Sequence, residues 1–129
     1  MGSRYQYQNT RQWVRVPCDW YVKYAAAPEA PEALVMARDA SAGGLRLVAR
    51  ESVAVGTRLH LKINVVPLQR TLSVVGRVAW VRAGEDGQYE WGVAFEQMDE
   101  ADRAALRRYT EETESKTTPS PRRRWWRAV

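Results

Sequence analysis

The strongest structural signal in the sequence is a strict alternation of polar and apolar residues from Arg58 to Val65. Successive side chains of an extended strand point to opposite faces, so a period of two predicts a β-strand with one buried face. The apolar members of this segment are Leu59, Leu61, Ile63 and Val65. A chain built on such segments has to fold as a sheet with one covered face.

Five further segments show the same alternation less regularly. In the fifth of the six segments, Val78 and Trp80 are two residues apart, so their side chains should point to the same face, which places Trp80 on the apolar face. Gly76 predicts a bulge in this segment. Loops rich in proline or glycine separate several segments, for example Ala25–Pro31 and Ala83–Gln88. The six predicted strands are residues 14–24, 34–38, 45–49, 59–65, 72–82 and 89–95.

One helix is predicted after the last strand. Asp99 is a suitable N-cap, and acidic residues in the first turn favour the positive end of the helix dipole. A narrow apolar stripe could cover one end of a barrel, and the helix should end near Glu114. The stripe consists of Ala101, Ala105, Leu106 and Tyr109. Six short strands followed by one helix favour a small antiparallel barrel, although periodicity does not give the strand order.

The composition argues against an enzyme or a metalloprotein. The 129 residues suffice for one domain with a modest core. A single cysteine, Cys18, excludes an internal disulfide and a cysteine-rich metal site, and its parity predicts a core position. The single histidine, His60, is expected on the solvated side of its strand, so no catalytic triad is available. No cofactor is expected.

Neither a membrane span nor a signal peptide is expected. No apolar run approaches the roughly 18 to 20 residues that a spanning helix needs, and the first residues lack an apolar centre. These features predict a cytoplasmic location.

The net charge of +5 lies entirely at the C-terminal end. Residues 1–115 hold 15 basic and 15 acidic residues, whereas residues 116–129 hold five basic residues and no acid. A nucleic-acid-binding domain usually carries a basic stripe over its body. The even balance of the body instead favours recognition of an anion by a few placed arginines.

Two motifs supply such arginines and a turn. Arg11 and Arg15 are four residues apart, so on an extended chain both guanidinium groups can point to one side and bind phosphate or a guanine edge. Asp39, Ser41 and Gly44 form an Asp-x-Ser-x-x-Gly turn between two predicted strands. Short polar side chains and glycine are typical of a turn that presents a ligand surface.

The pair of motifs, in this order, resembles the PilZ domain family, which comprises bacterial receptors for the second messenger cyclic di-guanylate (c-di-GMP). The resemblance runs from about Thr10 to about Tyr109 and includes the runs Gly76–Val81 and Trp91–Phe95. It implies a mainly β fold, a six-stranded antiparallel barrel with a C-terminal helix. We therefore expect a flexible arm at residues 1–9, the domain at 10–114 and a basic tail at 115–129.

The resemblance also implies roles for the motif residues. Arg11 and Arg15 would recognise guanine and phosphate, with one face available for stacking on a base. Asp39 would accept hydrogen bonds from guanine N1 and N2, and Ser41 would bond to base or phosphate. Gly44 would let the backbone approach closely, with a positive φ.

Several further residues are secondary candidates for ligand contact. Some family members carry another arginine where this chain has Thr10 and bind a stacked pair of ligand molecules, so Thr10 favours one ligand molecule per domain. Arg4 on the arm could substitute for that arginine. The remaining secondary candidates are Gly43, Trp80, Trp125 and Trp126.

Three functions remain open from the sequence. The first is a c-di-GMP receptor without enzymatic activity that passes its signal to a partner protein. The second is a PilZ-fold adaptor that binds protein without nucleotide. The third uses the arginine- and tryptophan-containing tail to bind nucleic acid or an anionic membrane, although such a tail can also be merely solvating, dock on a partner or stack on the bound nucleotide.

Overall fold

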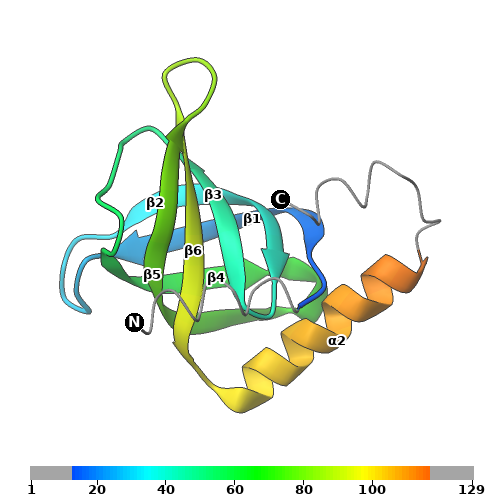
Figure 1. Ribbon diagram of the computed structural model, residues 1–129. Helices are drawn as coiled ribbons and strands as arrows, with labels where there is room; N and C mark the ends of the chain where they lie inside the picture. Colours follow the sequence, from blue (N-terminus) through cyan, green and yellow to red (C-terminus); the bar gives the residue numbers. More distant parts are fainter. Residues whose placement is uncertain (1–12, 117–129) are drawn as a thin grey trace.

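A computed structural model describes residues 13–116 of the chain. It contains six strands, a short 3-10 helix and one long helix (Figure 1). The strands are β1 (Val16–Ala25), β2 (Ala33–Ser41), β3 (Gly44–Ala49), β4 (Arg58–Val65), β5 (Arg70–Ala83) and β6 (Tyr89–Met98), and the helices are η2 (Val66–Leu68) and α2 (Glu100–Lys116). The candidates Arg4, Thr10, Arg11, Trp125 and Trp126 lie outside the described residues.

The six strands form one closed antiparallel barrel in the order β1-β2-β3-β6-β5-β4. Pairing of β1 with β4, for example Val22 with Ile63, closes the sheet. The predicted fold class, mainly β with a six-stranded antiparallel barrel and a C-terminal helix, is confirmed. The strand order, which alternation could not give, places β3 beside β6 and so brings distant segments together.

The inward positions of the strands fill the barrel with apolar side chains. Alternation in β4 is as predicted, because Leu59, Leu61, Ile63 and Val65 are all buried. Other large members of the core include Leu45, Leu47, Leu72, Val78, Trp91 and Val93. Since the interior is packed, a ligand has to be recognised on the outer surface or at an end of the barrel.

Strand β5 contains two irregularities in its pairing with β6. The pairing shifts between Val75 and Gly76, where a bulge was predicted, but the extra residue is Glu96 of β6, because Val75 pairs with Gln97 and Gly76 with Phe95. A second shift, between Val78 and Trp80, reverses the parity of the strand, so that Val81 packs against the core. The prediction that Trp80 lies on the same apolar face as Val78 was therefore wrong, because one extra residue turns Trp80 outward.

Helix α2 covers one end of the barrel, as predicted (Figure 1). Leu106 is fully buried in the core, and the ring of Tyr109 lies 5.9 Å from that of Trp20 on β1. Ala101 is exposed, so the contact face is shifted toward the C-terminus of the helix and includes the buried Thr110. The helix begins directly after Asp99 and ends at Lys116, two residues beyond the predicted Glu114.

Within residues 13–116, no helix is long and apolar enough to span a membrane. The same residues contain no group of three or more His, Cys, Asp or Glu side chains that could hold a metal ion.

The close packing around Gly76 provides a stability test. A Cβ added there would lie 2.7 Å from Val93 Cγ1 and 3.1 Å from the carbonyl oxygen of Ala94, both inside the packed sheet. Gly76→Ala should lower the free energy of unfolding by about 1 to 3 kcal/mol through overpacking. Gly84→Ala is the matched control, because its nearest neighbour would be 3.5 Å away. Equal urea midpoints for the two variants would contradict the packing described for Gly76.

Candidate functional site

The Asp-x-Ser-x-x-Gly motif forms the hairpin between β2 and β3. Ser41 ends β2 and pairs with Gly44 at the start of β3, which leaves Ala42 and Gly43 as the two turn residues. The hydroxyl of Ser41 is fully buried and accepts a hydrogen bond of 3.1 Å from the Gly43 N–H. The Gly43 carbonyl in turn accepts from the Phe95 N–H on β6 at 2.9 Å. Ser41 and Gly43 therefore hold the turn in place.

The structure favours glycine at position 44 for a different reason from the one predicted. The glycines of the described residues with positive φ are Gly56 and Gly87, and Gly44 is not among them. Gly44 instead lies in extended pairing with Ala94 of β6 and is buried. The prediction of a positive φ was wrong, whereas burial at a close strand contact still favours the smallest residue.

The structure brings together the described parts of the two predicted motifs. Arg15, just before β1, donates from Nη1 to Oδ1 of Asp39 at 2.6 Å. The second carboxylate oxygen of Asp39 accepts from Nε of Arg46 at 2.6 Å. Only 12% of the Asp39 side chain is exposed, so the two guanidinium groups supply the charged donors that a largely buried carboxylate needs.

The charged cluster continues across the outer face of the barrel. Arg46 also donates from Nη1 to Glu90 of β6 at 3.1 Å, and the other oxygen of Glu90 accepts from Nε of Arg82 on β5 at 2.7 Å. The resulting row, here called the arginine ladder, consists of Arg15, Asp39, Arg46, Glu90 and Arg82. Alternating charges of this kind fix one another's orientation, because each carboxylate bridges two guanidinium groups.

Sequence reasoning missed Arg46, Glu90 and Arg82. Their adjacency depends on the pairing of β3 with β6 and of β6 with β5, which the alternation pattern does not contain. A signal was nevertheless present, since Arg46 is the polar residue between the two apolar residues Leu45 and Leu47 and had to point outward.

Trp80 lies beside the ladder. Gly92 pairs with Arg46 on one side and with Trp80 on the other, and a Cβ on Gly92 would lie only 2.1 Å from the indole Nε1. The indole therefore lies over the backbone of Gly92. The guanidinium carbon of Arg82 is 5.0 Å from the centre of the same ring, a cation–π contact. Trp80, a secondary candidate, thus lies on the same outer face as Asp39 and Arg46.

A pocket of about 600 Å³ adjoins the ladder on the outer surface of β2, β3, β5 and β6. It is lined in part by Arg38, Arg46, Arg82 and Glu90. Arg38 is more exposed than Arg15 and Arg46 of the ladder and pairs with Asp19 at 2.7 Å. The Arg46, Glu90 and Arg82 part of the ladder therefore faces an open concave surface.

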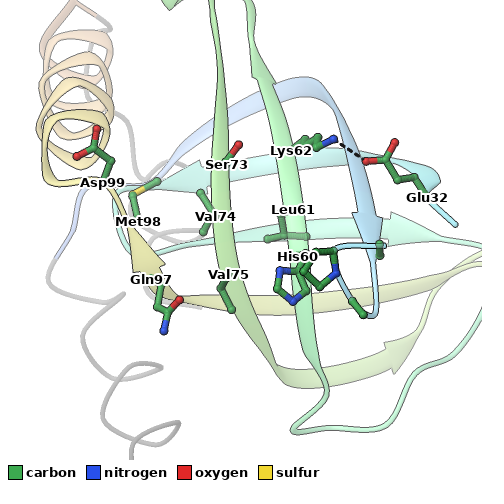
Figure 2. Close-up of a pocket in the computed structure, with 13 residues that line it drawn as sticks. Glu32, His60, Leu61, Lys62, Ser73, Val74, Val75, Gln97, Met98 and Asp99 are labelled. Atoms are coloured by element: carbon green, nitrogen blue, oxygen red, sulfur yellow. Dashed lines mark ion pairs between the residues drawn. The ribbon is translucent and has the colours of Figure 1, made fainter. Parts of the chain in front are cut away.

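A second pocket of about 510 Å³ lies on a different part of the surface, over β4, β5 and the end of β6 (Figure 2). His60 lines it, as does the ion pair of Lys62 with Glu32 at 3.0 Å. The hydrogen bond from Lys62 lowers the pKa of Glu32. None of the motif residues within 13–116 lines this pocket, so it is separate from the ladder.

Cys18 lies close to the site without taking part in it. Its thiol donates to the Ala37 carbonyl oxygen at 3.5 Å. Burial, and after it the charge of Asp39, raises the pKa of Cys18 to about 12. The thiolate, which is the reactive form, is therefore nearly absent at neutral pH. The prediction of an unreactive packed cysteine is consistent with this environment.

The fold and the ladder define a class of protein, a small closed barrel that presents arginines and a conformationally fixed turn on its outer face. The sequence model of the PilZ domain matches residues 9–112. This match covers most of the chain, and the chain belongs to the PilZ domain family. A comparison with curated proteins found no match.

Solved structures share the fold at low sequence identity. The inhibitor of motility MotI/DgrA of Bacillus subtilis has a TM-score of 0.73 and 19% identity over 84% of this chain and 53% of its own. The PilZ domain of YcgR from Escherichia coli, solved with c-di-GMP, has a TM-score of 0.63 and 13% identity over 81% and 92%. The MrkH–c-di-GMP complex of K. pneumonia has a TM-score of 0.66 and 14% identity over 82% and 55%. The present chain thus spans about half the length of MotI/DgrA and of MrkH.

The ladder predicts unequal effects for two arginines on neighbouring strands. Arg46→Ala leaves the largely buried Asp39 with one of its two charged donors, so it should lower the free energy of unfolding by about 1.5 to 3 kcal/mol. Arg38→Ala removes an ion pair whose side chains are 50% and 75% exposed, and it should cost less than about 1 kcal/mol. Urea denaturation measures both, and a larger loss for Arg38→Ala would contradict the importance assigned to the ladder.

The environment of Cys18 predicts slow thiol chemistry. With a pKa of about 12, about one molecule in ten thousand carries the thiolate at pH 8. The native protein should therefore react with a disulfide reagent at pH 8 far more slowly than the protein unfolded in urea, where the pKa returns to its ordinary value. Raising the pH should accelerate the native reaction. Equal rates in the folded and unfolded states would contradict the burial.

Proposed function

We propose that this protein is a receptor for c-di-GMP and has no enzymatic activity of its own. The observation that carries the proposal is the contact of Arg15 with Asp39, which joins one residue from each predicted motif on the outer face of the barrel. Membership of the PilZ family supports it, as do the PilZ domain of YcgR and MrkH, both solved with c-di-GMP.

The charge of the ladder suits a doubly anionic ligand. Within the described residues, the ladder has three guanidinium groups, on Arg15, Arg46 and Arg82, against the two carboxylates of Asp39 and Glu90. This leaves one excess positive charge. Arg11, four residues before Arg15, would add a second, and two positive charges match the two phosphates of a cyclic dinucleotide.

The site retains hydrogen-bonding capacity for a guanine base. Arg15 uses Nη1 for Asp39, so the rest of its planar fork remains able to bind guanine O6 and N7. A carboxylate has about four lone-pair positions, so Asp39 can accept from guanine N1 and N2 while it holds its two arginines. Ser41 is buried, and we assign its contribution mainly to holding the turn.

The proposed mechanism is ordering of the N-terminal arm by the ligand. Binding would hold Arg11 and Arg15 against the barrel, with one ligand molecule per domain, and so create a surface for a downstream protein partner. We place this activity in the cytoplasm, where the second messenger is made and read. The alternative, an adaptor that binds protein without nucleotide, would use the same fold and leave the arginines without a ligand.

Single substitutions of the motif arginines test the receptor function. Arg11→Ala and Arg15→Ala should each abolish measurable binding of c-di-GMP, because each removes a charge-assisted hydrogen-bonding fork worth about 1.5 to 3 kcal/mol. Lysine should restore little at either position, since it lacks the planar fork. Calorimetric titration measures binding, and circular dichroism checks that the variants are folded.

Arg108→Ala is the matched control, because it removes one positive charge at an exposed position of α2. It should bind as the unaltered protein does. Binding by both motif variants with unchanged affinity would refute the site. An unaltered protein that fails to bind the dinucleotide would instead favour the adaptor function.

A further inference from the structure

Helix α2 contacts the segment that carries the first motif. The guanidinium carbon of Arg107 lies 5.2 Å from the centre of the Trp13 ring, within the range of a cation–π contact. Trp13 is half-buried and lies two residues before Arg15. Trp13 is the middle residue of the Arg-x-x-x-Arg motif. The Trp13–Arg107 contact therefore holds the midpoint of the Arg-x-x-x-Arg motif.

The same helix also contacts the second motif. Arg103, one turn before Arg107, donates from Nη1 to the carbonyl oxygen of Ala42 at 3.0 Å. Ala42 is the first turn residue of the Asp-x-Ser-x-x-Gly hairpin. Two side chains on one face of α2 thus reach the two motifs, which are more than twenty residues apart in the sequence.

Several contacts fix the orientation of helix α2 on the barrel. Leu106 lies between Arg103 and Arg107 in the sequence and is fully buried in the core. Tyr109 packs on Trp20, and Asp102 accepts from Arg70 of β5 at 2.8 Å. These contacts lock the rotation of the helix about its axis, and with it the direction in which Arg103 and Arg107 point.

We propose that α2 aligns the two halves of the ligand site, with Arg107 and Arg103 as positioning residues that do not touch the ligand. Arg107 holds the Trp13 ring, and with it the chain that leads to Arg15, and Arg103 holds the hairpin that follows Asp39. The proposal rests on the proposed receptor function. It adds that affinity for the dinucleotide depends on a helix at the end of the barrel.

The expected effect follows from the fraction of molecules in which Trp13 and Arg15 are correctly placed. If only a fraction of molecules hold these two residues in the binding arrangement, the apparent dissociation constant rises as that fraction falls. Loss of one exposed cation–π contact should reduce affinity about two- to fivefold. The loss should appear in the association rate, while the dissociation rate stays the same, because the bound complex keeps its direct contacts.

The experiment compares c-di-GMP binding by the full chain and by Trp13→Ala, Arg107→Ala and the double variant. Calorimetry gives the affinities and stopped-flow fluorescence gives the rates. Each single variant should bind about two- to fivefold more weakly, and the double variant should be no weaker than the worse single one, since both lose the same contact. Arg103→Ala should weaken binding by itself and add to the effect of Arg107→Ala.

Two controls on the same helix isolate the contact. Arg107 also pairs with Glu111 at 3.1 Å, and Glu111→Gln removes that pair while leaving the cation–π contact in place. Arg108→Ala removes a neighbouring exposed charge. Both controls should bind with unaltered affinity, and Arg107→Ala, Glu111→Gln and Arg108→Ala should keep the urea midpoint of the unaltered protein.

The outcomes separate this proposal from the function on which it rests. If the unaltered protein binds c-di-GMP and Arg107→Ala binds with the same affinity and rates, the positioning role is wrong and the receptor function stands. If Arg107→Ala and Arg108→Ala weaken binding equally, the effect is one of general charge, and the role is again wrong. If the unaltered protein does not bind, the receptor function itself fails.

Discussion

The arrangement of charged side chains on the outer face of this barrel depends on one carboxylate that needs charged hydrogen-bond donors. Asp39 is mostly removed from water, and Arg15 and Arg46 each occupy one of its oxygens at 2.6 Å. Arg46 also pairs with Glu90 of β6. The ion pairs around Asp39 therefore connect the start of β1 with β2, β3 and β6. The residues that carry charge for a ligand are therefore held by the same contacts that stabilise the surface of the fold.

Much of the fold could be predicted, because most of its segments obey one parity rule. The alternation in Leu59–Val65 appears unchanged in β4, and the pairing of β5 with β6 shifts beside Gly76, although the extra residue lies in β6. The rule failed at Trp80, because an extra residue in β5 changes which side chains of the strand face the core after Val78. A one-residue shift leaves no signal in hydrophobicity, so only the pairing with β6 reveals it.

The candidate site was predictable to the extent that its residues belong to local motifs. Asp39, Ser41 and Gly43 form one hairpin, and Arg15 of the other motif lies against Asp39. Arg46 and Glu90, 44 residues apart, meet only because β3 pairs with β6. Contacts between distant strands depend on topology, which neither composition nor periodicity contains.

Closure of the barrel restricts how another protein could recognise it. Every one of the six strands has a hydrogen-bonded neighbour on both sides, so no strand is an edge strand along its whole length. The closing contact is short, because only Val22–Ala25 of β1 pair with β4. The closed sheet disfavours β-augmentation, in which a partner adds its own strand, along most of the barrel wall. A partner there has to bind side chains or the helix, and the same pairing protects most of the sheet against edge-to-edge aggregation.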